Sequence, residues 1–310
     1  MAPAPITTQD SDTVIFLDVD GVLNIGIHDE GNAPLLLRDE DVKTAVKLAK
    51  RGYKGPEAHC VAKLSALSQH PIGQMEDATY EKLMTLSGAE VSDVLVQRLA
   101  AIMEAAGESC QVVLSSSWRR QHHRSRRQTL ERCISKHLGK AFHFSETTPV
   151  TREEKCAADR LLTVGEYLKD LCTRRPLDAP ELRVLVLEDF FITAMDGWSC
   201  EGRRMESVVA AEQWLEDKAA SKGSISVKLV HCYEEITTES GLKMQVGRGL
   251  TQKSFEEAKE FVTSIMPASF EKGQGEETPP FPPTTASPKK ETGFLQMLSS
   301  WASPSVVRAF

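Results

Sequence analysis

The sequence of 310 residues has no Cys-x-x-Cys pair, no excess of basic residues and no apolar run long enough to cross a bilayer. Its 7 cysteines lie far apart and are odd in number, which favours reduced thiols over a disulfide framework or a zinc site. The net charge of -7 argues against a protein that coats nucleic acid over its whole surface. Residues 1–10 have neither a basic start nor an apolar stretch, so no signal peptide is expected. These absences predict a cytoplasmic protein, with a nuclear location left open.

Hydrophobic residues make up 41% of the chain, which is enough to build a core. Four apolar runs read as buried strands, at 13–17, 111–114, 182–187 and 225–230. Helical patterns lie between these runs. Because strands that alternate with helices form parallel sheets covered on both faces, the expected class is α/β, a Rossmann-like three-layer α/β/α fold.

One long segment interrupts this alternation. Residues 26–92 contain helical patterns near 39–50 and 56–69 but no clear strand. We therefore expect a helical cap insertion between the first and second strands of a domain that spans 13–266.

The two ends of the chain differ from this domain in composition. Residues 1–12 read as a disordered lead, and 267–293 as a disordered linker rich in Gly, Glu, Thr, Pro and Ser. Residues 294–310 form a short amphipathic segment, which either folds back on its own domain or docks on a partner or membrane surface. The sequence does not determine the oligomeric state.

Two carboxylates directly follow the first predicted strand. Asp18 and Asp20 lie where the crevice beyond the carboxyl ends of parallel strands binds ligands. Carboxylate oxygens suit Mg²⁺ and leave room for a phosphate. One carboxylate can attack phosphorus, and the other can protonate the leaving oxygen and then activate water. Asp-x-Asp alone is a weak signal, since metal-dependent glycosyltransferases and solvated turns also contain it.

Several motifs in order make the signal stronger. Phe-Leu-Asp-Val-Asp-Gly-Val-Leu-Asn is followed by Val-Val-Leu-Ser-Ser-Ser-Trp-Arg, Thr148-Pro149, a helix with Arg160 and Glu166, then Leu-Glu-Asp and Gly249-Leu-Thr251. Over roughly 13–265 this succession resembles the haloacid dehalogenase (HAD) superfamily of phosphohydrolases, and in particular the HAD domain of "Swiss army knife" RNA repair proteins.

The resemblance implies roles for particular residues. It makes Asp18 the nucleophile and Asp20 the general acid and base. The implied Mg²⁺ ligands are the carboxylates of Asp18 and Asp189 and the main-chain carbonyl of Asp20. Glu188, which stands where many relatives carry Asp, completes this metal site by supporting the ligands.

The resemblance also implies groups that bind the substrate phosphate. Ser115 or Ser116 would bind a phosphate oxygen, with Ser116 preferred, although serines after a strand also cap helices. The third HAD signature is a basic residue, for which Lys155 and Arg160 are candidates, with Arg160 favoured. Arg119 begins a basic run beside this pocket.

The predicted function is a Mg²⁺-dependent phosphatase that acts through an aspartyl-phosphate. The basic run 119–127 makes a nucleic-acid end or a nucleotide a plausible substrate, although Trp118 is the one nearby aromatic that could stack on a base. The alternative is a non-catalytic scaffold of the same fold that works through its C-terminal tail.

Overall fold

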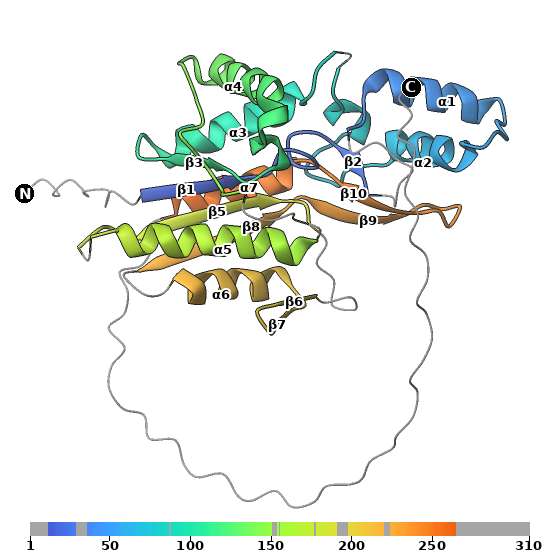
Figure 1. Ribbon diagram of the computed structural model, residues 1–310. Helices are drawn as coiled ribbons and strands as arrows, with labels where there is room; N and C mark the ends of the chain where they lie inside the picture. Colours follow the sequence, from blue (N-terminus) through green and yellow to red (C-terminus); the bar gives the residue numbers. More distant parts are fainter. Residues whose placement is uncertain are drawn as a thin grey trace, which may run out of the picture. The chain divides into compact units, whose positions relative to one another are not determined.

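The computed structural model describes residues 12–28, 36–86, 88–150, 154, 156–176, 178–190, 198–219 and 224–264 (Figure 1). The chain divides after Ile265 into two compact units, and all described residues belong to the first. The expected linker 267–293 and tail 294–310 lie outside the described residues, as does the expected lead apart from Asp12. No helix in these described ranges is long and apolar enough to cross a membrane.

A parallel sheet of five strands forms the centre of the fold, in the order β4-β3-β1-β5-β8. Its strands are β1 (Asp12–Leu17), β3 (Gln111–Leu114), β4 (Glu146–Thr147), β5 (Leu182–Glu188) and β8 (Ile225–His231). Two smaller antiparallel sheets are made of β2 (Gly26–Ile27), β10 (Lys243–Gly247) and β9 (Tyr233–Thr237), and of β6 (Trp198–Cys200) and β7 (Arg203–Met205).

Helices cover both faces of the central sheet (Figure 1). One side carries α3 (Asp93–Ala106), α4 (Arg124–Leu138) and α7 (Gln252–Thr263); the other carries α5 (Ala157–Arg174) and α6 (Val208–Ala219). The alternation along β1 explains this arrangement, since Ile15 and Leu17 join the apolar cluster of the first side, and Val14 and Phe16 join that of the second. Both faces of the strand are thus buried, as is typical of parallel sheets.

The registers of the strands bring their carboxyl ends together. Leu17 pairs with Leu114 of β3 and with Leu187 of β5. The main-chain N–H of Asp18 donates to the carbonyl of Leu187 at 3.0 Å, and that of Ser115 donates to the carbonyl of Leu17 at 2.9 Å. The residues that follow the three strands are therefore neighbours.

The expected insertion is mostly helical. It contains α1 (Asp39–Lys50), α2 (Ala58–Gln69) and the short 3-10 helix η1 (Tyr80–Leu83). The expectation of no strand was wrong at β2, which pairs with β10. This strand has two residues, too few to show an alternating pattern in the sequence.

The three-layer α/β class is confirmed, and all four predicted strands are present. Helix α4 was not predicted as a helix because it buries only Leu130 and Ile134, so its sequence reads as a charged solvated face. The hairpin of β9 and β10 was also missed. Its strands are five residues each and obtain their pairing from each other and from β2.

Candidate functional site

The centre of the site is the carboxylate of Asp18, which follows β1 and is 2% exposed. Glu188 ends β5 and Asp189 follows it, and both are buried as well. One carboxylate oxygen from each of these three residues lies within 4.8 Å of the others. Asp18 and Glu188 are 170 positions apart in the sequence, and the parallel pairing of β1 with β5 brings them together in one acidic cluster.

Burial in this cluster disfavours negative charge. It raises the pKa of Asp18 from 3.8 to about 6, with Asp189 and Asp20 adding to the rise and Arg160 opposing it. Burial likewise raises the pKa of Glu188 well above its ordinary value. Three buried carboxylates around one guanidinium leave negative charge uncompensated, and carboxylate oxygens are the donors that Mg²⁺ prefers. The donor set therefore fits a divalent cation.

Arg160 lies on α5 and reaches all three carboxylates. Its Nη2 contacts Asp18 and lies 2.6 Å from Glu188 Oε2, and its Nη1 lies 3.6 Å from Asp189 Oδ1. The side chain as a whole is 25% exposed. These contacts are compatible with the expectation that Arg160 is the basic residue of the third signature, which stays a prediction. The competing candidate, Lys155, lies outside the described residues.

Asp20 is half-buried and does not share the acidic cluster. Its side chain turns instead toward two neutral donors, with Trp118 Nε1 at 3.0 Å from Oδ2 and Asn24 Nδ2 at 3.0 Å from Oδ1. The metal contact expected from the main-chain carbonyl of Asp20 does not involve these two oxygens and stays a prediction. The structure thus separates the two members of the Asp-x-Asp motif.

Ser115 and Ser116 follow β3 and directly precede the 3-10 helix η2 (Ser117–Arg119). Ser115 Oγ lies 3.5 Å from Glu188 Oε1, whereas Ser116 Oγ accepts a hydrogen bond of 3.4 Å from the main-chain N–H of Trp118. Ser116 is therefore the N-cap of η2, in agreement with the helix-cap interpretation. Capping and binding of an anion at this turn are compatible.

Arg119 lies beside the serine loop, as expected, but its guanidinium is engaged by the protein. It is 6% exposed; its Nη1 donates to the carbonyls of Ser115 and Ser116 at 2.7 Å each, and its Nη2 pairs with Glu154. Both terminal nitrogens thus have protein partners, so these contacts favour a role in shaping the serine loop over contact with a phosphate. Trp118 is 1% exposed, so it offers no surface on which a base could stack.

Two glycines let the main chain approach Asp189. Gly21 has a φ of 77°, and a Cβ built on it would lie 1.8 Å from Asp189 Oδ2. A Cβ on Gly247 of β10 would lie 2.6 Å from the Cα of Gly21. The segment after β10 also stabilises the turn that follows β1, since the main-chain N–H of Gly249 donates to the carbonyl of Gly21 at 2.9 Å.

Sequence reasoning missed His28. This residue follows β2, and its Nε2 lies 2.8 Å from Asp189 Oδ2. Burial is the largest single influence and lowers its pKa, but the hydrogen bond to Asp189 and the negative charges of Asp189 and Asp18 together outweigh it and leave the pKa raised. No motif surrounds His28, so no signal in the sequence could have found it.

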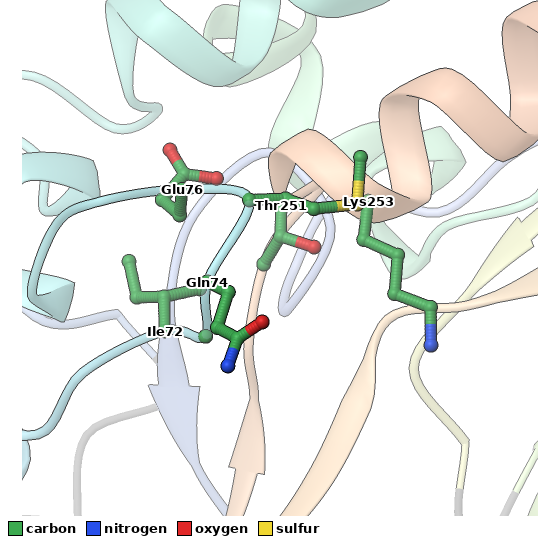
Figure 2. A pocket seen from close by; sticks show the side chains of 7 residues that line it. Ile72, Gln74, Glu76, Thr251 and Lys253 are labelled. Carbon is green, nitrogen blue, oxygen red and sulfur yellow. The ribbon is translucent and has the colours of Figure 1, made fainter.

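A hollow at the start of α7 is separate from this site (Figure 2). Residues 72–76 line it together with Thr251 and Lys253. None of the three residues of the acidic cluster around Asp18 lines it. Glu76 caps the helix there, accepting a 2.6 Å hydrogen bond from the main-chain N–H of Gln252. The hollow is therefore not the candidate active site.

Comparison with known proteins agrees with this geometry. The family model described as the HAD domain in Swiss Army Knife RNA repair proteins matches residues 14–213. The match includes β1, β3, α5 and β5, which carry the predicted site residues, but not β8 to α7. No curated protein and no solved structure was found to match the chain. The chain belongs to the HAD family found in Swiss Army Knife RNA repair proteins, and this membership supports a hydrolase of the phosphatase type.

Proposed function

We propose that the chain is a Mg²⁺-dependent phosphomonoesterase that forms an aspartyl-phosphate on Asp18. The observation that carries this proposal is the position of Asp18, which shares a buried cluster with Glu188, Asp189 and Arg160 while Asp20 lies two residues away. A phosphatase of this kind needs a nucleophile, an acid and compensation for phosphate charge. The site contains a residue type for each.

In the first step an Asp18 carboxylate oxygen attacks phosphorus, and the bond between phosphorus and the ester oxygen breaks. Asp20 gives its proton to the leaving oxygen. In the second step Asp20 takes a proton from water, whose oxygen attacks phosphorus and releases phosphate and the Asp18 carboxylate. Arg160 neutralises negative charge beside Asp18 throughout, and Ser115 or Ser116 donates to a phosphate oxygen.

The metal would be held by carboxylates of Asp18, Asp189 and Glu188 and by the Asp20 carbonyl. When bound, Mg²⁺ would offset the charge of the carboxylates and of the substrate phosphate.

The basic segment after the serine loop supports a substrate rich in phosphate. Arg124 on α4 is exposed and Arg126 and Arg127 are half-buried, and all three follow η2 closely in the chain. We propose nucleotide or RNA-end phosphates as substrates, bound through charge and without stacking on Trp118. All 7 cysteines are free, which supports a reducing compartment such as the cytoplasm.

A screen of phosphate esters with Mg²⁺ tests this function. It would compare an aryl phosphate, phospho-sugars, nucleotides, phosphopeptides and phosphorylated RNA and DNA ends, for the native chain, Asp18→Asn and the exposed control Asp170→Asn. We expect Asp18→Asn to lose at least about a thousandfold in kcat/KM, because the nucleophile is gone. Asp170→Asn should retain the native rate, and turnover of RNA ends should fall with added salt.

Absence of turnover on every ester with the native chain, or native turnover by Asp18→Asn, would overturn the proposal. The scaffold alternative depends on residues 294–310, which lie outside the described residues. The retained carboxylate cluster favours catalysis over that alternative.

A further inference from the structure

The side chain of Asp20 is held by two donors from different parts of the chain. Trp118 Nε1 and Asn24 Nδ2 each lie 3.0 Å from a different carboxylate oxygen. An indole N–H and an amide NH₂ only donate, so both contacts run in one direction. Two donors on two oxygens fix the rotation of the carboxylate as well as its place.

The two donors are themselves immobilised. Trp118 is 1% exposed and Asn24 is fully buried. Asn24 Oδ1 accepts a 2.8 Å hydrogen bond from the main-chain N–H of Gly21, and its Nδ2 also reaches the carbonyl of Glu90 at 3.3 Å. Asn24 thus joins the loop after β1 to the end of the helical insertion.

Arg126 and Glu90 connect Trp118 to Asn24, so that the contacts around Asp20 form a closed circuit. The guanidinium of Arg126 lies 5.5 Å from the ring centre of Trp118, a distance typical of a cation–π contact. Its Nε pairs with Glu90 Oε2 at 3.2 Å. Since the Glu90 carbonyl contacts Asn24, the contacts run from Asp20 through Trp118, Arg126, Glu90 and Asn24 back to Asp20.

We propose that Trp118 and Asn24 are positioning residues for the proton transfer by Asp20, and that Arg126 and Glu90 hold them in place. This inference rests on the proposed function, in which Asp20 protonates the leaving oxygen. A general acid acts only when its oxygen lies within hydrogen-bond reach of the atom that it protonates. The circuit aims Asp20 while leaving it outside the acidic cluster around Asp18.

The inference predicts a dependence on the leaving group. p-Nitrophenolate is a stable anion and can leave with little protonation, whereas an alkoxide is strongly basic and must be protonated as it leaves. Replacing Trp118 by Phe removes the N–H donor and keeps most of the ring. We expect Trp118→Phe to lower kcat/KM for an alkyl phosphate by about tenfold, the effect of one hydrogen bond, and to leave kcat/KM for p-nitrophenyl phosphate within about twofold of the native value. The quantity compared is kcat/KM because it reports the first step, in which the leaving group departs, whereas the second step uses Asp20 in the same way for both esters.

Trp214→Phe is the matched control, since Trp214 is a buried tryptophan of α6 in the apolar cluster on the other side of the sheet. It should leave kcat/KM for both esters at the native value. A purely structural role for Trp118 would lower kcat/KM of both esters equally, and that result would overturn the inference. If Trp118→Phe does not fold, Asn24→Asp replaces the other donor by a carboxylate, keeps the acceptor for the Gly21 N–H, and should show the same selective loss.

A measurement of the hydrogen bond itself does not depend on turnover. The chain has 4 tryptophans, so the indole N–H region of its NMR spectrum is simple, and Trp118→Phe assigns one signal. Asp20→Asn should shift that signal, whereas Asp170→Asn should not. An unmoved Trp118 signal would overturn the inference, whereas a native chain that hydrolyses no ester would overturn the proposed function.

Discussion

Gly21 shows how closely the residues of this site are packed. Its φ of 77° belongs to the left-handed region, and the carboxylate of Asp189 occupies the space that a Cβ would need. The same carboxylate accepts from His28 at 2.8 Å and faces Arg160. A side chain at position 21 would therefore displace a predicted metal ligand.

Gly21→Ala should lower turnover and the affinity for Mg²⁺ together. Its control is Gly241→Ala, because Gly241 has a φ of 79° and nothing within 4 Å of an added Cβ. Both variants should lose about 1 kcal/mol from backbone strain, measured by urea unfolding, but Gly21→Ala should lose more. Equal losses of stability, with native metal affinity in both, would contradict this account of Gly21.

At the scale of elements, a largely buried ion pair joins Glu76 of the helical insertion to Arg98 of α3, and both partners also contact the start of α7. Arg98 Nη2 lies 2.6 Å from Glu76 Oε1, and Arg98 Nη1 donates to the carbonyl of Leu250 at 2.9 Å. Glu76 in turn accepts a hydrogen bond from the main-chain N–H of Gln252 in the first turn of α7. Because the Gly249–Leu250 segment also binds the turn after β1, the pair supports one wall of the site.

Arg98→Met should destabilise the fold by about 3 kcal/mol, since it leaves the buried Glu76 without its cation. The double variant with Glu76→Gln should recover part of that loss, which a double-mutant cycle in urea would measure. The exposed pair of Arg203 and Asp217 is the comparison, and Arg203→Met should cause a much smaller loss. Similar losses in both single variants would show that Arg98 contributes no more than a surface charge.

For the molecule as a whole, the acidic cluster makes stability depend on pH. The folded chain keeps a proton on Asp18 up to about pH 6, whereas the unfolded chain releases it near 3.8. The folded state thus binds more protons between these values, so its stability falls as pH rises through this window. Bound metal would oppose the fall, because it favours the ionised carboxylate.

In metal-free buffer, the native chain should lose up to about 3 kcal/mol of unfolding free energy relative to Asp18→Asn as pH rises from about 4 to about 6. The asparagine has no proton to release, so its curve lacks this contribution. Saturating Mg²⁺ at pH 7 should reduce the difference. Parallel curves for the two chains, from urea unfolding at each pH, would count against the raised pKa of Asp18.

Local pattern was enough to predict the central sheet and its acidic edge. The stretches 14–17 of β1, 112–114 of β3 and 184–187 of β5 are continuous and apolar because both faces of these strands are buried, and that property is visible without coordinates. The edge strand β8 carries Ser226 and Lys228 among its apolar residues and is only partly buried, yet its Val and Leu residues still marked it as a strand. Once the strands are parallel, the residues after them meet at one edge. Asp18, Ser115 and Asp189 could therefore be placed together from the sequence, although their roles remain proposals.

The contacts around Asp20 and Asp189 were decided only by tertiary structure. Asn24, Trp118 and Arg126 carry no shared motif, and their meeting depends on the position of η2 and α4 against the insertion. His28 and Gly247 reach Asp189 through the small sheet of β2, β10 and β9, whose short strands leave little pattern in the sequence. The sequence by itself determined the strands and the carboxylates at their ends, because a buried strand requires apolar residues at neighbouring positions, and such a run can be recognised locally. The partners that orient those carboxylates come from packing between distant segments, which has no local pattern.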